Sequence, residues 1–173
     1  MFGALSAAAL IFALTLRISI MGRTSSQKSR LAYEKQILEK YFGSKVSWIN
    51  PSSDTRIEVS VTCSNDKKYT LRVYIPSNFP NDCPKMVVIP PQSSWFSYYL
   101  RKKDGSKMNG TSSKFHTLSG IDGYTRICHF NDSLWTDNNT LYQVVMKGLI
   151  WLEAYEAHLR TGKSMDVFLA EMA

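Results

Sequence analysis

Two neighbouring stretches with alternating apolar and polar residues constrain the fold of this chain more than any other feature. In "TRIEVSVTC" (residues 55–63) and in "YTLRVYIP" (residues 69–76), apolar residues recur at every second position. A period of two is typical of a strand that buries one face. The segment "SNDKK" between them is rich in turn-forming residues. Together the three segments predict an antiparallel hairpin, which excludes an all-helical fold.

The segments around this hairpin predict the remaining elements. Residues 24–43 and 140–162 carry apolar residues near helical spacing, and each ends in a glycine that can stop a helix. "KVSWIN" (45–50) and "MVVIP" (86–90) are typical of short strands, whereas residues 91–115 are loop-like and rich in serine. The order predicts an α+β fold: an N-terminal helix, an antiparallel β-meander, a long irregular segment and a long C-terminal helix.

The first sixteen residues, "MFGALSAAALIFALTL", carry no charge and are followed by Arg17. Counted through residue 21, the segment reaches the roughly 20 residues of a membrane span. Basic residues follow the segment, so an anchor would leave the rest of the chain in the cytoplasm. Two alternatives stay open: a helix packed outside the core, or a start at Met21 with Gly22 and Ser26 in myristoylation spacing. We therefore divide the chain into a hydrophobic segment, residues 1–24, and a folded domain, residues 25–170.

Composition narrows the classes of ligand. Apolar content of 44% with 20% charged residues predicts a folded domain, and the net charge of +7 is spread along the chain. Its one basic cluster, "RKKDGSK" (101–107), is typical of a solvated loop, so no nucleic-acid partner is expected.

The cysteines, Cys63, Cys83 and Cys128, are odd in number and widely spaced. We therefore expect no disulfide framework, no metal site and no cofactor. Three glycosylation sequons matter only if the domain faces a lumen: Asn109, Asn131 and Asn138.

Two further segments carry motifs: "YTLRVYIPSNFPNDCPKMVVI" (69–89) and "RICHFNDSLWTDNNTLYQVV" (126–145). The first resembles the strand–turn–strand of ubiquitin-conjugating enzymes, and the second resembles that family's active-site run of cysteine, tryptophan and threonine-leucine. The resemblance extends over about residues 25–169 and implies a UBC-like fold. The chain departs from the family's His-Pro-Asn tripeptide, because Thr117 and Leu118 follow His116.

The resemblance implies an activity. Cys128 would accept ubiquitin or a ubiquitin-like modifier from an activating enzyme as a thioester, and would pass it to a lysine or to a ligase. His116 would organise the adjacent loop and Trp135 would pack beneath it. Because Leu118 replaces the family's asparagine, oxyanion or loop support would have to come from Asn131, Asn109, Thr117 or a backbone amide.

Several other residues have expected roles near Cys128 or on the first helix. Arg126 and His129 flank Cys128, and either would favour its thiolate if it lies near. The first helix is basic and would dock an activating enzyme through Lys28, Arg30 and Lys35. Two other functions stay open: a non-catalytic UBC-like module that binds a modifier, and a Cys-His hydrolase that pairs Cys128 with His116 or His158. The local sequence motif of papain-like hydrolases is absent.

Overall fold

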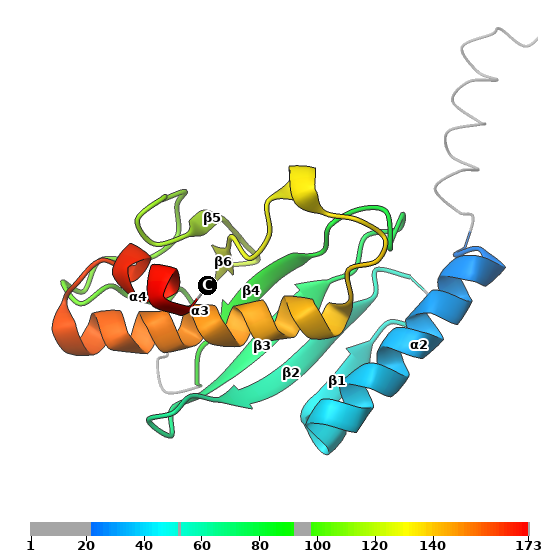
Figure 1. Ribbon diagram of the computed structural model, residues 1–173, viewed down its shortest axis with the longest axis horizontal. Coiled ribbons are helices and arrows are strands. Elements are labelled where there is room, and N and C mark those ends of the chain that lie inside the picture. The colour runs from blue at the N-terminus through cyan, green and yellow to red at the C-terminus, as the bar shows by residue number, and fades with distance from the viewer. Residues whose placement is uncertain (1–21, 52, 92–97, 173) are drawn as a thin grey trace, which may run out of the picture.

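An antiparallel sheet forms the centre of the structure, a computed structural model that describes residues 22–51, 53–91 and 98–172 (Figure 1). Within these residues the sheet has six strands in the order β1-β2-β3-β4-β6-β5. The strands are β1 (Val46–Ile49), β2 (Arg56–Thr62), β3 (Lys68–Tyr74), β4 (Lys85–Ile89), β5 (Thr117–Ile121) and β6 (Tyr124–Ile127). Each strand pairs antiparallel with its neighbours.

Helix α2 (Ser25–Phe42) lies beside β1 at one edge of the sheet (Figure 1). Its start is set by a capping box, because the Thr24 side chain accepts from the Gln27 N–H and the Gln27 side chain accepts from the Thr24 N–H. Gly43, at φ 57°, ends the helix, and the short 3-10 turn η1 (Gly43–Lys45) leads into β1.

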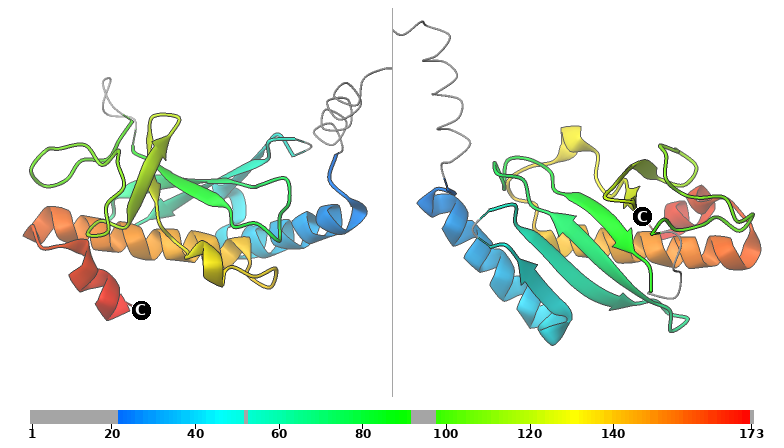
Figure 2. Two further views of the ribbon diagram at one scale, coloured as in Figure 1. Left: turned by 90° about the horizontal axis from the view of Figure 1, so that it is seen from above. Right: turned by 180° about the vertical axis from the view of Figure 1, so that it is seen from behind.

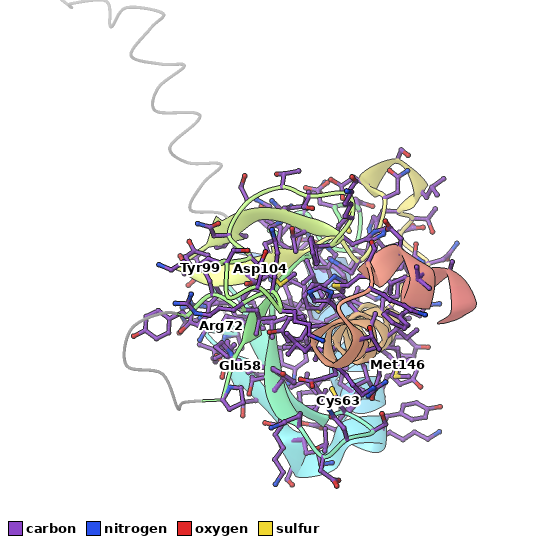
Figure 3. All side chains as sticks on the ribbon, turned by 90° about the vertical axis from the view of Figure 1, so that its left-hand side faces the viewer. Glu58, Cys63, Arg72, Tyr99, Asp104 and Met146 are labelled. Carbon is purple, nitrogen blue, oxygen red and sulfur yellow. The ribbon has the colours of Figure 1, made fainter. Side chains whose placement is uncertain are left out.

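Helix α3 (Leu141–Thr161) crosses one face of the sheet (Figures 1 and 2). Gly148 allows the close approach, since a Cβ atom at this position would lie 2.7 Å from Leu71 Cδ1 and 2.8 Å from Met86 Sδ. Gly162, in the left-handed region at φ 78°, ends the helix. On the opposite face of the sheet, Glu58 accepts from Arg72 at 2.6 Å (Figure 3). The apolar core therefore lies between the sheet and α3.

The predicted α+β order is confirmed, with both long helices and the first four strands in the predicted places. The predicted β-meander is confirmed as β1 to β4, which pair in chain order, and β6 rather than β5 is the strand added next to β4. The prediction of one irregular segment before α3 is wrong. Residues 98–115 contain no helix or strand longer than an isolated bridge, but β5 and β6 follow them as a hairpin, and a short turn, η2 (Asp132–Leu134), precedes α3.

The missed hairpin has a local signal in the sequence. Asp122 and Gly123 connect β5 to β6 and have φ values of 52° and 82°. Two consecutive positive φ values are typical of the tight turn that Asp-Gly favours. The flanking strands are short, and their register shifts between Leu118 and Ile121. This irregularity weakens the alternation that would have predicted them.

A short helix, α4 (Met165–Met172), packs against α3 and was not predicted. The predicted membrane anchor falls on residues 1–21, which lie outside the described residues. Across residues 22–51, 53–91 and 98–172, no helix combines the length and the apolar character that crossing a membrane requires.

Candidate functional site

A pocket of about 650 Å³ lies between the end of the β5–β6 hairpin, α3 and α4. It gathers the chemically reactive side chains that the sequence singled out, together with apolar residues of the two helices. The described residues that line it are His116, Cys128, His129, Lys147, Ile150, Trp151, Asp166, Leu169 and Ala170. We refer to this site as the Cys128 pocket.

Cys128 directly follows β6, where it is partly exposed. Its N–H donates to the His116 carbonyl oxygen at 2.8 Å, one position beyond the paired residues Thr117 and Ile127. Residues that oppose one another at such a position have Cα atoms about 4.5–5.5 Å apart. The hairpin therefore holds Cys128 and His116 next to one another. The Cys128 thiol donates to the Phe130 carbonyl oxygen at 3.8 Å.

His116 is held in an uncommon conformation. Its φ is 47°, in the left-handed region, which costs a non-glycine residue about 1 kcal/mol or more. The ring Nε2 lies 2.7 Å from Asp166 Oδ1. The sequence predicted neither the pairing nor any role for Asp166, because the two residues are 50 positions apart and nothing local connects them.

The charges around the Cys128 pocket differ from the expectation. Burial lowers the pKa of His129 from 6.5 to about 4, and the positive charges of Arg126 and Lys147 act in the same direction. His129 is therefore neutral near pH 7 and cannot supply a positive charge to Cys128. Lys147 of α3 lines the pocket instead, with its Nζ 4.7 Å from the centre of the Phe130 ring.

The residues expected to support the oxyanion or the loop form hydrogen bonds within their own segments. Asn131 accepts from Ser133 N at 3.1 Å and from Ser133 Oγ at 2.9 Å, and so caps η2. Thr117 is 3% exposed, and its hydroxyl donates to the Gly110 carbonyl oxygen at 2.8 Å. Neither residue is among the described residues that line the Cys128 pocket, nor is Asn109.

Trp135 packs next to the segment that follows Cys128. Its ring meets Phe130 edge-on at 5.2 Å, and its Nε1 donates to the Pro80 carbonyl oxygen at 2.8 Å. The other two cysteines are poor nucleophiles, since burial raises the pKa of Cys63 to about 12 and that of Cys83 to about 12.

The three residues of α2 that were expected to dock an activating enzyme, Lys28, Arg30 and Lys35, differ in their surroundings. Lys28 and Lys35 are exposed and lie two helical turns apart on one face. Arg30 instead bonds to Glu34 at 2.7 Å and to the carbonyl oxygens of Asp137 and Asn139. Its guanidinium is occupied within the domain, so of these three residues Lys28 and Lys35 are the ones that face solvent.

His158 lies away from Cys128. Its ring accepts from Lys103 N–H at 3.2 Å and lies 2.7 Å from the Lys163 carbonyl oxygen, near the end of α3. Of the two Cys-His pairs considered for a hydrolase, only the pair with His116 shares a pocket.

Within the described part of the chain, no group of three or more His, Cys, Asp or Glu residues is arranged to hold a metal ion. No family model matches this chain, and no curated protein matches its sequence.

Proposed function

We propose that this protein transfers an acyl group through a thioester on Cys128 and acts as a conjugating enzyme of the UBC-like type for ubiquitin or a ubiquitin-like modifier. The observation that carries the proposal is the Cys128 pocket. It places a partly exposed cysteine beside a histidine that is paired with an aspartate. The α+β order and the sequence resemblance over residues 126–145 support the same reading.

The proposed chemistry has two steps. The Cys128 thiolate attacks the thioester carbonyl of a charged activating enzyme, a new S–C bond forms, the old C–S bond breaks, and the cysteine of the activating enzyme leaves as a thiolate. A lysine amine then attacks the acyl carbon, Cys128 leaves as thiolate, and the amine gives up a proton. A positive charge nearby favours a thiolate, and Lys147 is the cation among the described residues that line this pocket. His116 lies where it can accept the proton.

Hydrolysis is a second candidate, because a pocket that holds Cys128, His116 and Asp166 has the three groups of a thiol hydrolase. The two functions share the acyl-cysteine and differ only in whether an amine or water accepts the acyl group. A non-catalytic binding module is the third alternative, and the substitution of Leu118 for the family's asparagine is the observation that favours it.

The test is a charging assay with the full chain, an activating enzyme, ATP and a panel of ubiquitin-like modifiers. We expect an adduct that reductant removes, and we expect Cys128→Ala to abolish it completely. Cys83→Ala is the matched control and should charge as wild type does, because burial raises the pKa of Cys83 to about 12.

Each outcome of this assay selects one function. Discharge of the adduct onto free lysine establishes conjugation, whereas loss of the adduct at the same rate with and without lysine indicates hydrolysis. If no modifier forms an adduct, while folded Cys128→Ala still binds one of them, the protein is a binding module.

The proposed function also includes a docking surface for the activating enzyme and a location for the domain at a membrane. The activating enzyme would bind the α2 face that carries Lys28 and Lys35, and residues 1–21 would tether the domain on the cytoplasmic side of a membrane.

Glycosylation checks the proposed location. The three sequon asparagines are exposed, so a domain in the lumen of the secretory pathway would present all three to the glycosylation machinery. We expect no glycan in a eukaryotic host, measured as no mass change after glycosidase treatment. The control is the same chain with a cleavable signal peptide in place of residues 1–21. Glycosylation of the unaltered chain would contradict a cytoplasmic domain.

A further inference from the structure

Helix α4 contributes a charged side chain to the Cys128 pocket. Asp166 stands in its first turn, and its Oδ1 lies 2.7 Å from His116 Nε2. The other elements of the pocket are the β5–β6 hairpin, which supplies His116 and Cys128, and α3, which supplies Lys147. Helix α4 therefore adds a carboxylate to reactive groups that the hairpin and α3 already hold.

The main chain around His116 is fixed from two sides. Cys128 N–H donates to the His116 carbonyl oxygen at 2.8 Å, and Trp151 Nε1 of α3 donates to the Phe115 carbonyl oxygen at 3.0 Å. These bonds hold the backbone and leave the imidazole ring free to turn. The Asp166 carboxylate is the group that fixes the ring.

Asp166 is itself held in place. Its Oδ2 accepts from Ser164 Oγ at 3.3 Å, and the same hydroxyl lies 3.4 Å from the Lys114 carbonyl oxygen. Met165, next to Asp166, is 0% exposed and anchors the first turn of α4 in the core. The carboxylate therefore has a defined position relative to the segment that carries His116.

A carboxylate accepts hydrogen bonds and donates none, so in the neutral imidazole it selects the form in which Nε2 carries the proton. Nδ1 then keeps its lone pair, and among the described residues no group hydrogen-bonds to it. The other charged or titratable groups of the pocket are Lys147 from α3, and Cys128 and His129 from the segment after β6. His129 stays neutral because burial lowers its pKa to about 4.

We propose that Asp166 is a positioning residue that holds the His116 ring with Nδ1 as its proton acceptor, so that α4 completes the transfer site. The proposal rests on the proposed function for its chemistry. When an amine attacks the acyl carbon on Cys128, a C–N bond forms, the C–S bond breaks, and the electron pair of that bond returns to sulfur. The proton of the amine passes to His116 Nδ1, and Asp166 stabilises the resulting imidazolium.

The test compares wild type with Asp166→Asn, Asp166→Ala and Asp166→Glu. Nitrogen-15 NMR of the His116 ring should show the Nε2-protonated form in wild type. The preference for the Nε2-protonated form should be lost in Asp166→Asn and Asp166→Ala and restored in Asp166→Glu. Single-turnover discharge onto lysine should slow by about tenfold or more in Asn and Ala, since general-base catalysis typically contributes about 10²–10⁴-fold. Charging of Cys128 should keep its rate, because it does not use this proton transfer.

The matched control is Asp137→Asn, which neutralises an exposed aspartate away from the pocket and should change neither readout. The NMR measurement needs no modifier and no activating enzyme, so it tests the Asp166–His116 pairing even if Cys128 never charges. An unchanged ring form in Asp166→Asn and Asp166→Ala would overturn the proposal. The proposal would also be overturned if these variants lost the preference for the Nε2-protonated form and still discharged onto lysine at the wild-type rate.

Discussion

Arg30→Ala is expected to lower the free energy of unfolding by about 3 kcal/mol, because it leaves a buried carboxylate without its cation. Glu34 is 0% exposed, and its two oxygens accept from Arg30 Nε at 2.7 Å and from Leu141 N–H at 2.8 Å. Leu141 is the first residue of α3, so Arg30 and Glu34 together tie α2 to the start of the helix that covers the sheet. Urea unfolding at pH 7 measures the effect.

Lys35→Ala is the matched control for this experiment. Lys35 lies 3.7 Å from Glu39, and both side chains are at least half exposed, at 55% and 50%. Removal of such a surface pair changes stability by less than about 1 kcal/mol. If Arg30→Ala instead unfolds as wild type does, while capture by an activating enzyme weakens, then Arg30 has the docking role that its position on a basic helix suggests.

A fall in pH from 7 to 5 is expected to remove about 2 kcal/mol of stability through His129 alone, since one pKa unit corresponds to about 1.4 kcal/mol. Burial lowers the pKa of His129 in the folded protein to about 4, whereas the ordinary value is 6.5. The unfolded chain therefore takes up the proton first as the pH falls. The contribution is fully present above pH 6.5, is lost between pH 6.5 and about 4, and changes no further below that.

The measurement is urea unfolding at several pH values for wild type and for His129→Leu, which removes the titrating ring and keeps an apolar side chain. The difference between the two curves isolates His129 from the carboxylates that titrate over the same range. A constant difference from pH 7 to pH 5 would show that His129 gains its proton in the folded state as readily as in the unfolded chain. It would also restore His129 as a candidate cation beside Cys128.

Local patterns predicted the elements that have enough residues to show a period. The alternation in residues 55–63 and 69–76 gave β2 and β3, and the glycines at 43 and 162 end α2 and α3 as expected. The β5–β6 hairpin was missed although Asp122 and Gly123 have the sequence of its turn, because the register of its strands shifts between Leu118 and Ile121 and breaks the regular alternation. Helix α4, with eight residues, was too short to stand out.

The candidate site was only partly accessible from sequence. Cys128 and His116 came from a resemblance to a family motif, and the hairpin that sets them opposite one another was not predicted. Asn131 and Thr117 have the right chemistry, but their side chains are bound to Ser133 and to Gly110. His129 is next to Cys128 in sequence, yet burial removes the charge that adjacency suggested.

By itself, the sequence determined the α+β order, the ends of the two long helices and the first four strands. Periodicity, caps and turns depend on residues within a few positions of one another, so they can be seen in a single chain. Only the tertiary structure decided that Arg30 faces inward, that Lys147 lines the same pocket as Cys128, and that Asp166 reaches His116 from 50 positions away. Those contacts arise when α3 and α4 pack against the sheet, and packing brings together residues that share no local pattern.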